Sequence, residues 1–191
     1  MENWNSFKNT VDINNITKEN WQDLYSIGGW EGKGSGPGSE ASVNSELVSY
    51  ISNFIFKNKI ASIVDFGCGD LQWISQIFSN QLSYVGVDFT PSIINANNAS
   101  FPDQTFILND VLNITGTYEV VICKDLIHHC RNNASTYFAK MNETSSRYII
   151  LIGPTYLKNL ESFRALFQQY NYKPVLDFIS DEEKTIHLLT K

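Results

Sequence analysis

The chain lacks any run of about 18 apolar residues, the length that a membrane-spanning helix requires. Its first ten residues, MENWNSFKNT, lack the basic and then apolar pattern of a secretory signal. Cysteine is scarce, with three residues in the whole chain. Three cysteines do not make the disulfide framework of a small secreted domain. These absences predict a cytoplasmic protein without a membrane span.

Clustered positive charge is also missing. The chain has 14 Lys and Arg against 20 Asp and Glu, a net charge of −6, and no basic stripe. A surface of that sign repels a phosphate backbone over about one Debye length, roughly 8–10 Å. Long nucleic acid is therefore disfavoured as a partner, and nothing in the composition fixes an oligomeric state.

What the chain does have is enough apolar residues, 42% of the total, for one domain with a sizeable core. Short apolar runs alternate with amphipathic segments. We predict strands at residues 60–66, 82–88, 105–108, 118–123, 147–152, 172–179 and 185–190, and helices starting at Thr17 and Thr90 or spanning 39–57, 71–79, 133–145 and 160–170. This alternation predicts an α/β fold, with helices on both faces of a mostly parallel seven-stranded sheet and a last antiparallel strand.

The central stretch is residues 63–74, IVDFGCGDLQWI, which reads as a buried strand, a glycine turn and a helix. Gly67 and Gly69 let the backbone approach a ligand closely, and the first amides of the following helix are expected to face that ligand. A dinucleotide fingerprint has a third glycine where Gln72 stands. Because Asp65 and Asp70 would also repel a pyrophosphate, the loop favours a ligand with a cationic amino acid end.

Two later strands also end in acids. Asp88 follows the second strand, where it is placed to accept hydrogen bonds from ribose hydroxyls, and Asp110 follows the third, where an acid can read an adenine amino group. An ordinary strand-end cap is the alternative role for each. The three strand ends in this order resemble the class I S-adenosylmethionine (SAM) methyltransferases over roughly residues 60–191.

That resemblance implies a Rossmann-like fold and SAM as cofactor, with S-adenosylhomocysteine (SAH) as product. Asp65 would face the amino acid end of SAM, or else hold the glycine loop by accepting its amides. Phe89 and Val111 would sandwich the adenine, and Lys124 would lie beside the methionine portion through its backbone. The expected cofactor-binding residues are Asp65, Gly67, Gly69, Asp88, Phe89, Asp110, Val111, Lys124 and Trp30.

Residues 28–39 are half glycine. Composition alone indicates a linker, whereas Trp30 and the aromatic residues upstream, which are unfavourable in water, indicate a loop that closes over a ligand. The GGW…SGPGS pattern resembles a subset of bacterial and viral methyltransferases associated with polysaccharide or glycan modification. We therefore predict a helical arm and lid loop over residues 1–39 and a SAM-binding methyltransferase domain over 40–191.

The candidates for catalysis follow the fourth strand, in the run KDLIHHC. A hydroxyl acceptor requires a base, and His128 or His129 suits this role because imidazoles titrate near neutrality. If Asp125 and His129 share a helical face at the i, i+4 spacing, the acid would orient the imidazole. The alternative for either histidine is a hydrogen-bonded structural residue.

No metal site is predicted. The neighbours His129 and Cys130 do not converge easily on one zinc ion, and a magnesium ion held through Asp125 and another carboxylate is the alternative. Trp73 is expected to be a core residue, and His187 is expected to face solvent from its strand.

Together these features predict a SAM-dependent methyltransferase (EC 2.1.1.-) that O-methylates a hydroxyl of a sugar, glycan or other small-molecule acceptor. The alternative enzyme is a methyltransferase that acts on nitrogen or oxygen in a protein or RNA. The lack of an Asn/Asp-Pro-Pro-Tyr motif after the fourth strand argues against N-methylation of adenine or of a glutamine amide, and the acidic surface argues against RNA. A non-catalytic SAM-binding module would keep the cofactor crevice and make both histidines dispensable. An NAD-binding dehydrogenase is disfavoured by the missing third glycine.

Overall fold

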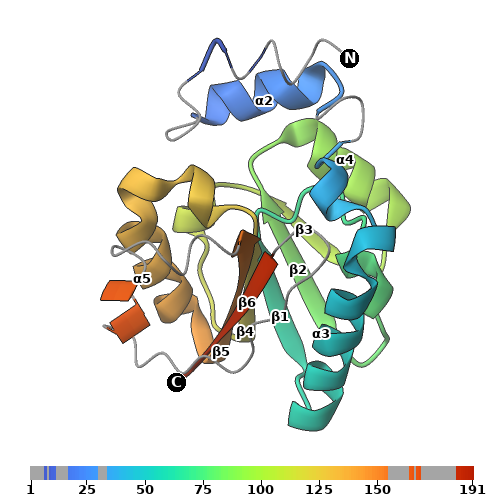
Figure 1. The fold of residues 1–191 in the computed structure, drawn as a ribbon. Helices are drawn as coiled ribbons and strands as arrows, with labels where there is room; N and C mark the ends of the chain where they lie inside the picture. The colour runs from blue at the N-terminus through green and yellow to red at the C-terminus, as the bar shows by residue number, and fades with distance from the viewer. Residues whose placement is uncertain are drawn as a thin grey trace.

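A six-stranded sheet in the order β3-β2-β1-β4-β5-β6 forms the centre of the computed structural model, which describes residues 7, 9–11, 17–29, 34–154, 164–165, 167–168 and 184–191 (Figure 1). The strands are β1 (Ser62–Phe66), β2 (Ser83–Asp88), β3 (Thr105–Leu108), β4 (Tyr118–Lys124), β5 (Ser145–Pro154) and β6 (Lys184–Thr190). Strands β1 to β5 are parallel, and β6 runs antiparallel to β5. The predicted Rossmann-like architecture is confirmed with six strands, and the strand predicted at 172–179 lies outside the described residues.

Helices cover both faces of the sheet. The α-helices are α2 (Lys18–Ser26), α3 (Ser45–Asn58), α4 (Pro91–Ser100) and α5 (Ala134–Thr144), and α3 begins six residues later than predicted because two short 3₁₀ turns, Pro37–Ser39 and Ser42–Asn44, precede it. Helices α3 and α4 pack on one face and α5 on the other (Figure 1). Successive strand residues point to opposite faces, so Ile63 packs with the α3 layer and Val64 with the α5 layer.

Two helix starts agree with the sequence. The Thr17 hydroxyl accepts the Asn20 amide at 3.3 Å, and the Asn20 side chain accepts the Thr17 amide at 3.1 Å, which closes a capping box. Thr90 occupies the N-cap position of α4, with Pro91 as the first helical residue. The Thr90 hydroxyl makes no capping hydrogen bond there; instead, its amide donates to Asp88 at 2.9 Å.

The helix predicted over 71–79 is wrong. Only a 3₁₀ turn, Ile74–Ile77, forms in this stretch. Leu71 has a left-handed backbone with φ of 61°, which prevents an α-helix from starting directly after the glycine turn. The glycine loop therefore offers no helix N-terminus to a ligand.

The prediction for His187 is also wrong, because this residue is only 4% exposed. Its ring lies 4.9 Å from the ring of Phe167, between centroids. Strand alternation predicts exposure only where one face of a sheet meets water, and in this α/β sheet both faces are covered. Trp73, by contrast, is 4% exposed and belongs to the core, as predicted.

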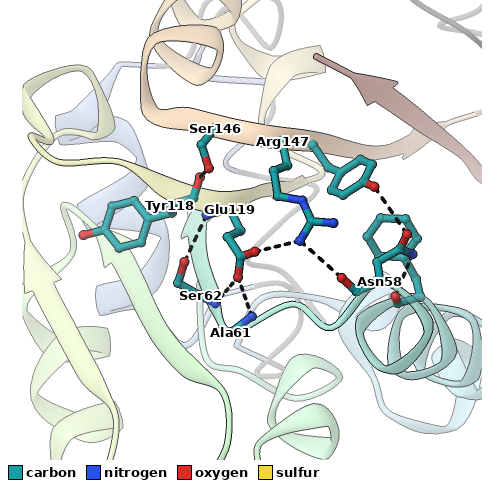
Figure 2. A network of polar contacts seen from close by, with 9 residues as sticks. Asn58, Ala61, Ser62, Tyr118, Glu119, Ser146 and Arg147 are labelled. Atoms are coloured by element: carbon teal, nitrogen blue, oxygen red, sulfur yellow. Dashed lines mark hydrogen bonds and ion pairs between the residues drawn. The ribbon is translucent and has the colours of Figure 1, made fainter.

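A polar network ties the amino ends of β1, β4 and β5 together (Figure 2). Glu119 accepts the amides of Ala61 and Ser62 at 2.5 and 3.3 Å through one carboxylate oxygen. Its other oxygen accepts from Arg147 at 2.7 Å, and the same guanidinium nitrogen donates to the Asn58 carbonyl at 3.2 Å. These contacts fix the end of the sheet opposite to the carboxyl ends of its parallel strands.

Candidate cofactor site

A cavity of about 320 Å³ opens at the carboxyl ends of the parallel strands, where ligands bind in open α/β sheets. Its described walls come from the glycine loop after β1, the segments after β2, β3 and β4, helix α2, and residues 35–39. The volume lies at the lower end of the range that holds one small ligand.

Most of the predicted site residues line this cavity. Those lining the cavity are Asp65, Gly67, Gly69, Asp88, Phe89, Asp110, Val111, Lys124, Asp125 and His129. Trp30 and the side chain of His128 lie outside the part of the chain that the structure describes.

The glycine loop is held by the end of β2. The amides of Gly67 and Cys68 donate to the Val87 carbonyl at 2.9 and 3.1 Å. Gly69 donates to the Asp88 carboxylate at 3.2 Å and its carbonyl accepts from Asn97 at 2.8 Å. Both glycines have positive φ, 74° and 54°, a conformation that side chains with a Cβ disfavour.

Asp88 acts as a cap and also lines the cavity. One carboxylate oxygen accepts the Gly69 amide, and the other accepts the Thr90 amide. Burial raises the pKa of Asp88, and these amide hydrogen bonds act in the opposite direction. Each carboxylate oxygen has a second lone pair, so the cap contacts leave capacity for a ligand hydroxyl.

Asp110 makes a similar local contact and one distant contact. Its Oδ1 accepts the Leu112 amide at 2.9 Å, which caps a 3₁₀ turn. Its Oδ2 pairs with Lys18 Nζ of α2 at 2.5 Å. The amino-terminal helix therefore reaches the strand end that was predicted to read adenine.

Asp65 is 2% exposed and accepts a hydrogen bond from the Tyr84 hydroxyl at 2.8 Å. Burial raises the pKa of Asp65 to about 7, although the Tyr84 hydrogen bond and the charge of Lys124 lower it. Its hydrogen bond is thus to a neighbouring strand and not to the glycine loop, while the residue still faces the cavity.

The side chain of Lys124 contacts two other parts of the cavity wall, and the predicted approach of its backbone to the methionine portion of SAM stays a prediction. Its Nζ donates to the Gly38 carbonyl at 2.7 Å and to Asp125 Oδ2 at 2.6 Å. Asp125 has a left-handed backbone with φ of 56° and precedes the 3₁₀ turn Ile127–His129. The proposed helical i, i+4 pair with His129 is therefore wrong, because Asp125 is not part of that helical turn.

Helix α2 lies across the carboxyl ends of the strands, above the sheet in Figure 1. Besides the Lys18–Asp110 ion pair, Gln22 donates to the Phe89 carbonyl at 3.3 Å. The ring of Trp21 packs edge-on against His129, with centroids 4.9 Å apart. The helix thus touches the segments after β2, β3 and β4, and its Trp21 and Tyr25 line the cavity.

Several lining residues were not predicted as site residues, among them Ser35, Ser39, Gln72, Tyr137 and Pro154. Ser35 and Ser39 belong to the SGPGS run, so the glycine pattern was a usable signal for them. Tyr137 on α5 and Pro154 at the end of β5 enter the wall through the packing of distant segments. No local sequence signal identifies those two.

Comparison with known proteins agrees with this geometry. Residues 64–144 match a family model described as a methyltransferase domain. No curated protein sequence matches the chain significantly. Similar solved structures include magnesium protoporphyrin IX methyltransferase (ChlM) from Synechocystis PCC 6803 with bound SAM (16% identity, TM-score 0.67, 78% of this chain and 80% of that chain). The methyltransferase domain of bacterial CtHen1 (14%, 0.64, 78% and 100%) and the N-methyltransferase NodS from Bradyrhizobium japonicum WM9 (8%, 0.63, 78% and 97%) are also similar.

The fold is that of the SAM-dependent methyltransferases. The residues around the cavity fit SAM, the molecule bound in the ChlM structure. The glycine loop allows close approach of the ligand, the carboxylates of Asp88 and Asp110 supply acceptors for hydroxyl and amino groups, and Phe89 and Val111 supply apolar walls. When bound, SAM supplies a methyl group on a positively charged sulfur.

In the parts of the chain that the structure describes, no group of three or more His, Cys, Asp and Glu side chains is arranged to hold a metal ion. None of the described helices has the length and apolar character to cross a membrane.

Proposed function

We propose that this chain transfers a methyl group from SAM to a hydroxyl oxygen of a sugar, glycan or other small-molecule acceptor, with a histidine of the 128–129 pair as general base. The observation that carries the proposal is the position of His129. Its side chain lines the same cavity as Asp88 and Asp110, the two acids assigned to the cofactor nucleoside. A base and a donor site in one small cavity support transfer to a hydroxyl.

The cofactor roles follow from the strand ends. Asp88 accepts hydrogen bonds from the ribose hydroxyls, and Asp110 accepts from the adenine amino group while Phe89 and Val111 pack on the ring. Asp65 faces the amino acid end of the cofactor, because its carboxylate is buried in the cavity wall beside the glycine loop.

The proton step belongs to His129. One imidazole nitrogen takes up the proton of the acceptor hydroxyl as the oxygen is methylated, and the edge of the ring rests against Trp21. Asp125 is paired with Lys124 in the same wall, so this ion pair contributes to the local electrostatic field around the acceptor.

The residues that α2 contributes to the cavity favour a small acceptor. Trp21 and Tyr25 of α2 bring aromatic surface into the cavity, and aromatic rings suit stacking against the apolar face of a sugar ring. We assign residues 1–39 to an arm and lid and residues 40–191 to the SAM-binding domain. The net charge of −6 disfavours RNA as acceptor, and a cytoplasmic location stays a prediction.

Calorimetry and a transfer assay test the proposal. The protein should bind SAM and SAH and should not bind NAD, and label from methyl-labelled SAM should appear on members of a panel of sugars and sugar nucleotides. His129→Ala should lower kcat by about 100-fold or more while SAH affinity stays unchanged. Asp88→Ala should weaken SAH binding at least tenfold, because the ribose loses its acceptor.

Three outcomes would contradict the proposal. Binding of NAD without SAM would remove the cofactor assignment. Full transfer activity in a protein carrying both His128→Ala and His129→Ala would remove the base. SAM binding with no transfer to any hydroxyl acceptor, and no loss of biological activity in the same double variant, would indicate a non-catalytic SAM-binding module.

A further inference from the structure

Residues 34–39, which we call the strap, cross the mouth of the cofactor cavity between α2 and α3. Ser35, Gly36, Gly38 and Ser39 of the strap line the cavity. Glycine-rich composition is typical of a linker, yet each end of this segment is bound by a charged side chain of the cofactor site itself.

The first anchor is Asp70, the residue directly after the glycine loop. The amide of Ser35 donates to Asp70 Oδ2 at 2.9 Å, and the amide of Asp70 donates to the Ser35 hydroxyl at 3.1 Å. The Gln72 side chain also donates to Asp70 Oδ2, at 2.7 Å. Two reciprocal hydrogen bonds therefore join the strap to the loop that approaches the cofactor.

At this contact, a Cβ added to either of two glycines would meet a side-chain oxygen of the other segment. A Cβ on Gly34 would lie 2.1 Å from Asp70 Oδ2, and a Cβ on Gly69 would lie 2.4 Å from the Ser35 hydroxyl. Both glycines also have positive φ, 60° and 54°. One glycine from each partner thus makes room for the other segment, as expected for a built contact.

The second anchor is Lys124, at the end of β4. Its ammonium group donates to the Gly38 carbonyl at 2.7 Å and is paired with Asp125. The Lys124 side chain is only 5% exposed, and the Gly38 carbonyl also accepts from Asn44 at 3.1 Å. The strap is therefore held by an anion at one end and by a cation at the other, both from the cavity wall.

The strap also connects two parts of the site. The hydroxyls of Ser35 and Tyr25 lie 3.1 Å apart, which joins the strap to α2. On the other side, the glycine loop contacts Asp88 through the amide of Gly69. A displacement of Ser35 would therefore act on both the α2 cover and the acid assigned to the ribose.

The closed contact also has an unfavourable feature. The Oδ1 atom of Asp70 is buried and, within the described part of the chain, has no hydrogen-bond partner. Burying an acceptor without a partner is unfavourable, so opening of the strap would return this oxygen to water.

Resting on the function proposed above, we propose that the strap is a movable wall of the cofactor site, held shut by Asp70 and Lys124, and that Ser35 is a positioning residue for the glycine loop. The strap slows the escape of bound cofactor product. It does not serve as a passive linker between α2 and the domain.

Ser35→Ala tests this inference because it removes the hydroxyl that contacts Asp70 and Tyr25. We expect SAH to bind about tenfold more weakly, mainly through faster dissociation in stopped-flow fluorescence. The melting temperature of the ligand-free protein should stay unchanged, because the strap opens without global unfolding. Ser42→Ala, at an exposed position just beyond the strap, is the matched control and should leave SAH binding unchanged.

A second pair of variants tests the same contact by adding a Cβ to a glycine. Gly34→Ala should weaken SAH binding at least as much as Ser35→Ala, because the new Cβ collides with Asp70. Gly116→Ala is its control, since Gly116 also has a positive φ, 99°, but the nearest atom to an added Cβ is 3.8 Å away. That variant should lose some stability and keep its SAH affinity.

Unchanged SAH dissociation in both Ser35→Ala and Gly34→Ala would overturn the inference while leaving the proposed function intact. The inference would also be overturned if the ligand-free variants melted at a lower temperature and this loss of stability accounted for all of the lost SAH affinity. The strap would then have only a structural role. Failure of the unaltered protein to bind SAH would instead remove the cofactor assignment on which the inference rests.

Discussion

One buried carboxyl group, that of Asp65, lies in the wall of the cavity. Asp65 lies in β1 beneath the cavity, with Tyr84 donating to its carboxylate. Because burial raises the pKa of Asp65 to about 7, its charge changes in the physiological range. A cationic ligand group nearby would favour the charged form, so the residue links pH, stability and cofactor binding.

Asp65→Asn should remove a pH dependence of stability. The unfolded chain loses the Asp65 proton above its ordinary pKa of 3.8, whereas the folded protein keeps it until about pH 7. Stability contributed by this group therefore falls as pH rises between those values, by about 1.4 kcal/mol for each unit of pKa difference. Urea unfolding should show that the free energy of unfolding of the variant, relative to that of the unaltered protein, is higher at pH 8 than at pH 5.

The exposed Asp103→Asn is the control for that comparison, and it should follow the unaltered protein at both values. If Asp65→Asn shows the same pH profile as the unaltered protein, Asp65 is not held protonated in the folded state.

Leu71 combines a strained backbone with a buried side chain. It has φ of 61° and is 1% exposed, directly after the glycine turn. Leu71→Ala should lower the unfolding free energy by about 2–5 kcal/mol through the cavity that it leaves. Leu71→Gly should be more stable than Leu71→Ala by roughly 1 kcal/mol, because glycine adopts a left-handed conformation without strain.

Denaturant unfolding of the two variants checks that order. In a right-handed helix or a strand the order would be reversed, since glycine is there less stable than alanine. A glycine variant weaker than the alanine variant would therefore show that Leu71 is not left-handed in solution.

At the scale of elements, the two ends of the sheet serve different purposes. At the carboxyl ends, α2 contacts the segments that follow β2, β3 and β4 through Gln22, Lys18 and Trp21. At the amino ends, the network of Figure 2 joins β1, β4 and β5 through Glu119 and Arg147. The first set of contacts lies at the cavity, and the second set joins the strands at the opposite end of the sheet.

Glu119→Gln tests this division of roles. Hydrogen bonds from the Ala61 amide, and then from Arg147, lower the pKa of Glu119 below its ordinary value of 4.5. A lowered folded pKa contributes stability above the unfolded value and loses it as pH falls through the folded value. The variant should therefore be less stable by about 1–2 kcal/mol at pH 7, where these are charge-assisted hydrogen bonds, and the difference should shrink below pH 4.

Chemical denaturation at the two pH values measures this effect, with Glu46→Gln in the first turn of α3 as an exposed control. SAH affinity should be the same in all three proteins. A loss of SAH affinity in Glu119→Gln would contradict the separation between the two ends of the sheet.

For the whole molecule, folding and ligand binding are coupled through one cavity, because its walls come from segments that span the chain from α2 to Pro154. The unfolded chain has no such cavity. Any ligand that fits the cavity must therefore stabilise the folded molecule against unfolding.

SAH at 100 times its dissociation constant should raise the unfolding free energy by about 2.7 kcal/mol. For a chain of 191 residues, that corresponds to an increase of several degrees in melting temperature, which calorimetry can measure. NAD at the same concentration should give no shift. An equal shift with NAD would contradict the cofactor assignment.

Local sequence signals were sufficient to predict the six described strands, helices α2 to α5, the antiparallel last strand and the acids at strand ends. Hydrophobic periodicity and turn residues act over a few neighbours, so the printed sequence contains those signals directly. For this reason β3 matched its predicted bounds of 105–108, and Thr17 began α2 as expected.

Packing between distant segments sets which of those residues meet. The left-handed backbones of Leu71 and Asp125 ended helical patterns that looked continuous in sequence. The burial of His187 and the anchoring of the strap by Asp70 and Lys124 depend on segments far apart in the chain. Such contacts are formed by packing across many residues, and no local pattern encodes them.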